Sequence, residues 1–197
     1  TLFYAQNEED IASVITNLRT EMELEEEDDV AGFLGVHIER RPDGTIHLTQ
    51  KGLIDQIIQA LNIGDLSSKR TRAEQGCLGL DPEEDPPDST YSYLSVIGML
   101  QYLQGHSRPN ITFTVSQCVH WTHCPKLSHE KELERIDRYL KGTKNLGLIL
   151  QLLETSDFHI NCYVDTDFSG TWGFKQAQDP SCVKSCTGFV IFIMGTP

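Results

Sequence analysis

Side chains that zinc prefers lie close together at one place in the sequence, at Cys118, His120, His123, Cys124 and His129. Structural zinc sites use such thiolates and imidazoles in closely spaced pairs. The spacing here does not match those pairs, and on a helix only His120 and Cys124 would share a face. The pattern therefore favours the surface of a helix followed by a loop over a zinc site.

Two other groups of polar side chains carry weaker patterns. Cys182 and Cys186 lack the spacing of a zinc knuckle. The pair Asp28–Asp29 ends a strongly acidic run, so a solvated stretch of charge is the better interpretation than a metal site. The sequence contains no glycine-rich phosphate loop, nucleophile elbow or dinucleotide-binding fingerprint.

The charge is unevenly distributed along the 197 residues, whose net charge is −13. Residues 8–29 hold ten acidic side chains against one basic side chain. In contrast, residues 40–72 hold six basic and three acidic side chains, and residues 126–144 hold six and four. The net charge argues against a free-standing nucleic-acid binder, but the middle of the chain could still present a mildly basic face.

Composition and the chain start indicate the compartment. The content is 39 % hydrophobic and 23 % charged, as in ordinary globular proteins. The six cysteines are scattered, which favours free thiols in a reducing compartment. No apolar run has the length of a membrane helix, and the start has no basic segment of a signal peptide. We expect an intracellular protein, in the cytoplasm or nucleus, with no membrane partner.

The first half of the chain has clear periodicities. Ile11, Val14, Ile15 and Leu18 predict an amphipathic helix that begins after Asn7. Apolar and polar residues then alternate at 36–38 and 46–48, on either side of the turn sequence Arg41-Pro42-Asp43-Gly44, which predicts a β-hairpin. A second amphipathic helix is expected from about residue 52 to residue 62.

The second half changes from helices to strands. Residues 64–90 mix prolines, glycines and acids, which predicts a long exposed loop. Apolar stripes predict helices from Tyr93 onward, and Pro109 is suited to the first turn of one of them. Residues 159–164 and 188–193 are typical of β-strands.

Several strings occur in one order that resembles a known family. They are Ser107-Arg108-Pro109-Asn110-Ile111, Arg138-Tyr139-Leu140-Lys141-Gly142-Thr143 and Tyr163-Val164-Asp165-Thr166-Asp167. Together with Phe33-Leu34-Gly35-Val36, they resemble the junction between polymerase and RNase H in the Pol polyprotein of copia-type LTR retrotransposons. Two departures stand out: Tyr91-Ser92-Tyr93 replaces the usual Tyr-Arg, and Asn110 replaces the usual Asp, which puts charge-dependent contacts there in doubt.

The resemblance implies an α+β fold in four parts. Residues 1–63 would be the end of a reverse-transcriptase palm with a primer-grip-like hairpin, and residues 64–90 an exposed loop. Residues 91–153 would form a helical thumb or connection segment, and residues 154–197 the first strands of a truncated RNase H-like domain.

The resemblance also implies site residues. Phe33, Leu34 and Gly35 would belong to the primer-grip-like hairpin that holds the end of the growing strand. Asp165 falls on the first metal-binding carboxylate of RNase H, and Asp167 is a neighbour of uncertain role. Two-metal chemistry needs several converging carboxylates, and the family's other acids would lie outside this sequence. Mg²⁺ is therefore expected in the parent enzyme, and none is expected to bind this chain tightly.

The implied function is that of a fragment of an RNA-directed DNA polymerase with RNase H. Its partners would be an RNA/DNA hybrid or a DNA duplex and the remainder of the Pol polyprotein. Taken alone, the chain is expected to position the primer–template duplex without catalysing either reaction. The alternatives are a non-catalytic module that binds nucleic acid or protein, and an inert remnant of a decayed element.

Overall fold

The computed structural model describes residues 5–24, 32–62, 67–71, 83–87, 91–151, 158–166, 185 and 187–196. The chain divides into two compact units, Thr1–Val30 and Ala31–Pro197. Helices and small antiparallel sheets occur together, which confirms the predicted α+β class. None of the described helices has both the length and the apolar character needed to cross a bilayer. The predicted loop 64–90 lies largely outside the described residues.

The first unit contains helix α1, Glu8–Glu21. Three acids in its first turn and Arg19 in its last turn complement the helix dipole. Asn7 occupies the predicted N-cap position, but its side chain makes no capping hydrogen bond. No residue of α1 is buried, so its apolar stripe is only partly covered.

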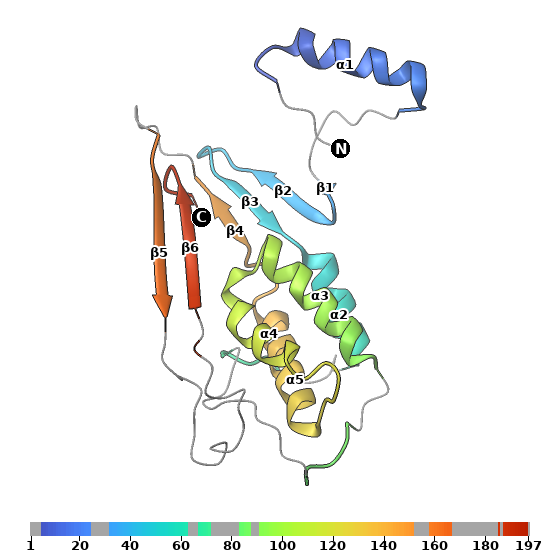
Figure 1. Ribbon diagram of the computed structural model, residues 1–197, viewed down its shortest axis with the longest axis vertical. Helices are drawn as coiled ribbons and strands as arrows, with labels where there is room; N and C mark the ends of the chain where they lie inside the picture. Colours follow the sequence, from blue (N-terminus) through green and yellow to red (C-terminus); the bar gives the residue numbers. More distant parts are fainter. Residues whose placement is uncertain are drawn as a thin grey trace. The chain divides into compact units, whose positions relative to one another are not determined.

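The second unit begins with a four-stranded antiparallel sheet in the order β1-β2-β3-β4 (Figure 1). Its strands are β1, Gly32–Phe33; β2, Val36–Arg40; β3, Ile46–Thr49; and β4, Leu148–Leu150. The predicted hairpin is confirmed as β2–β3, in which Ile38 pairs with Leu48. Strand β4 forms an edge of the sheet that the sequence did not predict. In the sequence it follows the last of the helices.

Particular residues explain two features of the sheet, the β2–β3 turn and the close approach of β4 to β3. In the β2–β3 turn, Asp43 Oδ1 accepts hydrogen bonds from Thr45 N (3.0 Å) and Thr45 Oγ1 (2.7 Å), while Gly44 takes a φ of 82°. These contacts are the turn chemistry expected of Asp-Gly. Where β4 joins the sheet, a Cβ atom at Gly147 would collide with the carbonyl oxygen of Leu48. Only glycine therefore allows β4 to approach β3 here.

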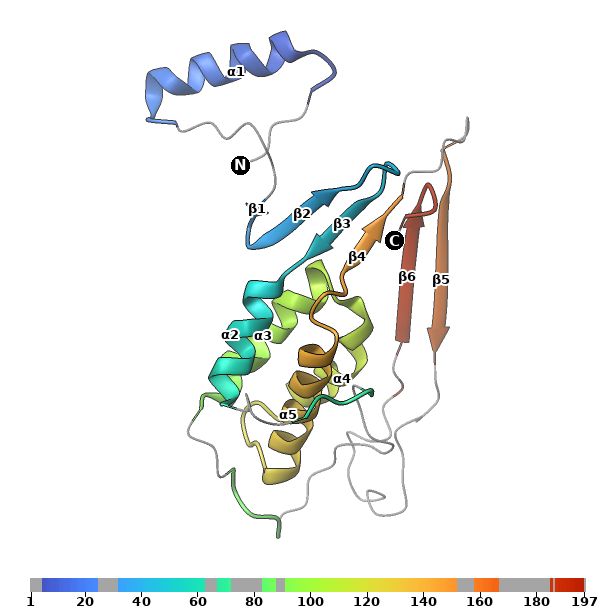
Figure 2. The same ribbon diagram turned by 180° about the vertical axis from the view of Figure 1, so that it is seen from behind.

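Four helices group together beyond one end of this sheet (Figures 1 and 2). They are α2, Lys51–Leu61; α3, Tyr93–His106; α4, Thr112–Val119; and α5, Leu127–Gly142. Helix α2 ends at Leu61, which confirms the predicted end near residue 62, and Asn62 follows it in the left-handed conformation. A 3₁₀ turn, Pro109–Ile111, leads into α4 with its proline at the first position.

The core of the second unit lies among these helices. Each contributes apolar side chains that are nearly or fully buried: Ile54, Ile57, Leu61, Val96, Ile97, Leu100, Leu103, Ile111, Val115, Leu133, Ile136 and Leu140. Burial of such side chains contributes roughly 1.5–3 kcal/mol each relative to exposure. The sheet is thus held in place by the helical core to which β3 and β4 connect.

The last element is a two-stranded hairpin of β5, Ile160–Thr166, and β6, Thr187–Ile193. Its strands confirm the two predicted strand segments. Every residue of β5 is exposed, and one face of the hairpin carries exposed Ile160, Val164, Phe189, Ile191 and Ile193. Within the described residues, β5 pairs only with β6, and Ile193 of β6 also forms an isolated bridge with Thr196. An apolar sheet surface of this kind is typical of an interaction surface.

Candidate functional site

The turn between β1 and β2 is the most unusual backbone feature in the predicted site. Leu34 and Gly35 have φ values of 52° and 71°, and Phe33 pairs with Val36 on either side of them. Two successive positive φ values define a type I′ hairpin turn. Leucine in the left-handed region costs roughly 1–2 kcal/mol. The predicted residues Phe33, Leu34 and Gly35 are thus brought together on one strained turn.

Tyr102 of α3 holds this turn from outside the sheet. Its hydroxyl donates a 2.6 Å hydrogen bond to the carbonyl oxygen of Leu34. The Tyr102 ring lies 4.2 Å from the ring of His106, whose Nδ1 lies 2.8 Å from the carbonyl oxygen of Tyr102. The Leu34 side chain itself is 63 % exposed. The Leu34 side chain therefore faces solvent, while the hydrogen bond from Tyr102 holds the backbone of the turn.

The contact between Tyr102 and Leu34 could not be predicted from local sequence patterns. Tyr102 lies within the predicted helix from Tyr93, but its hydrogen bond to Leu34 spans 68 residues of sequence. The only available signal was a tyrosine on the polar side of the helix, with a hydroxyl that needs a partner.

Arg108 joins two of the family-like strings into one buried network. Its guanidinium donates to the carbonyl oxygen of Thr143 (Nη1, 3.0 Å) and to Thr143 Oγ1 (Nη2, 2.8 Å). It also lies 5.6 Å from the centre of the Tyr139 ring. Arg108 is only 2 % exposed, and this burial lowers the pKa of its side chain. Arg108 therefore acts as an internal connector and is not positioned to contact a ligand.

Asn110 and Ser107 extend this network in two directions. Asn110 Oδ1 accepts from Arg108 Nε (3.2 Å), and Asn110 Nδ2 donates to the Tyr139 hydroxyl (2.7 Å). Ser107 Oγ donates to Gln50 Oε1 (2.8 Å) at the junction of β3 and α2. The departure at Asn110 noted in the sequence thus falls on a contact with a buried cation, where a carboxylate would be a charged partner.

Asp165, the predicted metal ligand, lies in β5 opposite Gly188 of β6 and is exposed. Across the described residues, no three His, Cys, Asp or Glu side chains come together in a group that could hold a metal ion. Asp28, Asp29, Asp167, Cys182 and Cys186 lie outside the described residues. A single carboxylate without described acidic neighbours does not fit the ligand set of a two-metal site.

The candidate zinc ligands differ in burial. His120, His123 and Cys124 are exposed, as the interpretation of a helix surface predicts. That interpretation is wrong for Cys118 and His129, which are buried. Burial raises the pKa of the Cys118 thiol to about 12.

His129 already has a structural role at the start of α5. Its Nδ1 accepts a hydrogen bond from the backbone N of Lys126 (2.9 Å), and its ring stacks 4.8 Å from Trp121. These contacts occupy one ring nitrogen and fix the ring plane, so His129 is explained as part of the helix cap.

Two acids of α5 are buried and unusual. Asp137 is fully buried, and neither of its carboxylate oxygens has a hydrogen-bond partner in the described part of the chain. Burial raises its pKa from 3.8 to about 7, and Lys141 partly opposes this shift. Burial likewise raises the pKa of Glu132 to about 7, although Arg135 Nε lies 3.8 Å from its Oε2. Neither acid lies in a metal-binding group among the described residues.

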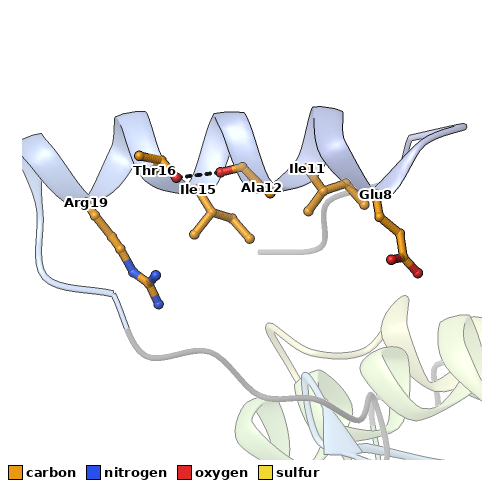
Figure 3. A pocket seen from close by; sticks show the side chains of 6 residues that line it. All are labelled: Glu8, Ile11, Ala12, Ile15, Thr16 and Arg19. Atoms are coloured by element: carbon orange, nitrogen blue, oxygen red, sulfur yellow. Dashed lines mark hydrogen bonds between the residues drawn. The ribbon is translucent and has the colours of Figure 1, made fainter.

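A hollow of about 320 Å³ follows one face of α1 (Figure 3). Among the described residues its lining comes from that helix: Glu8, Ile11, Ala12, Ile15, Thr16 and Arg19. The Thr16 hydroxyl is already bonded to the carbonyl oxygen of Ala12 (2.7 Å). The remaining polar groups sit at opposite ends of the hollow, so it lacks the convergent polar groups of a ligand site.

Comparison with curated proteins finds relatives over most of the chain. The retrovirus-related Pol polyprotein from transposon RE1 of Arabidopsis thaliana is 29 % identical over 182 residues, which is 92 % of this chain. The Pol polyprotein from transposon RE2 of the same plant is 29 % identical over 171 residues, or 86 % of the chain. An uncharacterised mitochondrial protein of Arabidopsis thaliana is 28 % identical over 164 residues.

These relatives confirm the resemblance to retrotransposon Pol polyproteins. The chain spans only 12 % and 11 % of the length of the two polyproteins, and 62 % of the mitochondrial protein. The chain matches no protein-family model and no solved structure.

The Arg108 network leads to a first prediction. The variant Asn110→Asp would place a carboxylate beside the buried guanidinium, since Asn110 Oδ1 already accepts from Arg108 Nε. We expect its free energy of unfolding to rise by about 1 kcal/mol at pH 7, because a charged acceptor strengthens this hydrogen bond. Urea unfolding at low salt measures the change. Asn17→Asp on exposed α1 is the control, and an equal gain in that variant would contradict the prediction.

The buried Asp137 leads to a second prediction. Its raised pKa means that the folded chain holds a proton that the unfolded chain releases between pH 4 and pH 7. The free energy of unfolding should therefore decrease as pH rises through this window. The variant Asp137→Asn should show a smaller decrease, because only the part due to Glu132 remains, and it should be more stable than the wild type at pH 8 by about 2 kcal/mol.

Urea unfolding between pH 4 and pH 8 tests this expectation. The exposed Asp10→Asn on α1 is a suitable control, because it removes the same charge without changing burial. A pH profile of Asp137→Asn that stays parallel to the wild-type profile would show that Asp137 is not the titrating group.

Proposed function

We propose that this chain, a relative of one segment of retrotransposon Pol polyproteins, positions a primer–template duplex as part of a reverse transcriptase with RNase H. In this proposal residues 1–63 form the palm end with its primer-grip-like hairpin, and residues 91–153 form the thumb or connection segment. Residues 154–197 begin the RNase H-like domain. The partners are an RNA/DNA hybrid or a DNA duplex and the remainder of the polyprotein.

The strained turn at Leu34–Gly35 is the observation that supports this proposal most directly. A leucine at positive φ is disfavoured, and an asparagine or glycine would fit the turn better. The Leu34 side chain contributes little to the core, because it is 63 % exposed. Backbone strain at an exposed residue is typical of sites where geometry serves binding. The turn lies in the part of the chain that resembles the primer grip.

Catalysis in this proposal belongs mostly to residues outside this chain, in the remainder of the polyprotein. Phosphoryl transfer by polymerases depends on two metal ions and on precise placement of the reacting ends. The chain would supply placement through its hairpin and helices. Asp165 is the one candidate carboxylate for Mg²⁺ in the described residues, and it needs further acids to bind the ion tightly.

A second candidate function is that of a protein-interaction module. It is favoured by the β5–β6 hairpin, whose apolar residues are exposed on one face. Such a module would bind nucleic acid weakly at any salt concentration. The third alternative, an inert remnant, predicts the same weak binding.

The turn can be tested by the variant Leu34→Gly. Glycine removes the backbone strain, so the free energy of unfolding should rise by about 1 kcal/mol. Affinity for a short RNA/DNA hybrid should fall about fivefold, because the fixed apolar contact is lost. Fluorescence anisotropy over a salt series measures the affinity.

The control for this experiment is Leu94→Ala on α3, because Leu94 is 64 % exposed and closely matches Leu34. It should leave the affinity unchanged. Unaltered binding by Leu34→Gly would refute the role of the turn. Wild-type affinity that is negligible, or that does not fall with salt, would refute the proposed function and favour the alternatives.

The isolated chain should neither extend a primer nor cleave an RNA/DNA hybrid in the presence of Mg²⁺. The physical reason is the lack of a converging set of carboxylates among the described residues. Gel assays of labelled primer and labelled hybrid measure both activities, with a complete reverse transcriptase as the positive control. Product formation that depends on Mg²⁺ would show that this chain contains a complete active site.

A further inference from the structure

The chain reverses direction at the end of β6. Met194 and Gly195 have φ values of 53° and 80°, the pair of left-handed conformations that defines a type I′ hairpin turn. On either side of this turn, Ile193 N donates to the carbonyl oxygen of Thr196 (2.7 Å), and Thr196 N donates to the carbonyl oxygen of Ile193 (3.0 Å). Such a reciprocal pair is one rung of an antiparallel ladder. The backbone at Thr196 thus has the geometry of a third strand that begins beside β6.

Strand β6 has an outer edge that faces away from β5. Met194 N donates towards β5, to the carbonyl oxygen of His159 (3.1 Å), whereas Ile193 N donates to Thr196 on the other side. The backbone groups of alternate residues in a strand point to the same edge. The other residues whose groups lie on the outer edge are therefore Thr187, Phe189 and Ile191. Apart from the bridge at Ile193, no described residue pairs with this edge.

The composition of β6 suits the addition of a strand. A two-stranded hairpin is only marginally stable in water, and a third strand or a packed helix is usually needed. Every residue of β5 is exposed, and Phe189 of β6 is 72 % exposed. The segment Thr187–Ile193 contains no charged side chain and no proline. An open edge without these protective residues is a template for pairing with another segment.

The next residue of the sequence is compatible with such a strand. With Thr196 opposite Ile193, position 197 falls opposite Phe192, where the N–H of an added strand would point away from β6. Proline has no N–H, so Pro197 removes no hydrogen bond to β6. Three further rungs then remain for the strand, opposite Ile191, Phe189 and Thr187.

The side chain of Thr196 holds the start of this strand in place. Thr196 Oγ1 donates to the carbonyl oxygen of Gln151 (2.7 Å) and accepts from Gln151 N (3.2 Å), directly after β4. The residue after the turn is therefore fixed both by β6 and by the end of β4. A fixed starting point lowers the entropy cost of ordering the segment that follows.

We propose that the outer edge of β6 binds a β-strand from the polyprotein segment that follows Pro197, antiparallel to β6 and in register with the Ile193–Thr196 pair. The inference rests on one part of the proposed function, the remainder of the Pol polyprotein as a partner, and is independent of duplex binding. The two Pol polyproteins have most of their length outside the matched region, because this chain spans 12 % and 11 % of them. The side chains opposite Ile191 and Phe189 should be apolar, since they extend the apolar face of the hairpin.

The test compares amide hydrogen exchange in this chain and in a longer piece of the same polyprotein that continues beyond Pro197. In this chain, the outer amides of Phe189 and Ile191 should exchange about tenfold faster than the inner amides of Val190 and Phe192, which face β5. In the longer piece, the outer amides should slow to the rate of the inner amides. Outer amides that remain as fast in the longer piece would overturn the proposal.

The variant Gly195→Ala tests the turn within the longer piece. Alanine is disfavoured at a φ of 80°, so the outer amides should exchange about tenfold faster than in the unmodified piece. Gly188→Ala is the matched control, because Gly188 of β6 has no positive φ and a Cβ there meets no atom within 4 Å. The outer amides should stay slow in this control. The amide of Leu133 in the core of α5 should be unchanged in both variants, which shows that the fold is intact.

Two results with these variants contradict the proposal. Slow outer amides in Gly195→Ala would show that the turn does not set the register. Equal acceleration in Gly195→Ala and Gly188→Ala would show that any change in the hairpin has the same effect.

A second copy of this chain is the competing occupant of the edge. Sedimentation velocity over a concentration series should show a monomer whose outer amides are fast. A dimer whose formation slows the amides of Phe189 and Ile191 would refute the proposal in favour of self-association. Hybrid binding is a separate measurement: its absence, together with slow outer amides in the longer piece, would remove duplex positioning and leave the strand in place.

Discussion

The buried guanidinium of Arg108 is the interaction on which the arrangement of the second unit depends. A buried cation is unstable unless its donors are satisfied. Arg108 meets this need with both the backbone and the side chain of Thr143, directly after α5. Its neighbour Ser107 bonds to Gln50, directly after β3. The chain leaves the sheet at Gln50 and returns to it through β4 soon after Thr143, so two adjacent residues fix both connections between the sheet and the helices.

The opposite edge of the sheet is held less firmly. Among the described contacts, Tyr102 reaches the β1–β2 turn with one exposed hydrogen bond to Leu34. An exposed hydrogen bond contributes on the order of 1 kcal/mol, which is similar to the strain of leucine at positive φ. The hydrogen bond from Tyr102 therefore offsets the backbone strain of Leu34, so the turn keeps a defined shape.

Local patterns predicted the elements whose causes are local. The Asp43–Gly44 turn and the end of α2 at Asn62 follow from side-chain chemistry within a few residues. Strand β4 could not be predicted, because its three residues become a strand only by pairing with β3. The burial of Asp137 was partly visible, since it lies four residues after Leu133 and three before Leu140 on the apolar stripe. The charge of Asp137 nevertheless predicts an exposed side chain. Only the packing of α5 in the folded chain shows that it is buried.

The net charge of the chain does not show how its acidic and basic segments are distributed in the fold. The excess of acid comes largely from segments before the hairpin and in the 81–88 region, whereas hydrogen bonds from Arg138 and Arg135 unite two basic segments. Long-range attraction is screened beyond about 10 Å at moderate salt. The described acids of the 81–88 region include one that contacts α5, because the Glu84 carboxylate accepts hydrogen bonds from Ser128 N (2.6 Å) and Ser128 Oγ (2.8 Å) at the start of that helix. The net charge of −13 therefore does not describe the field at any one place in the fold, because that field depends on the charges within about 10 Å.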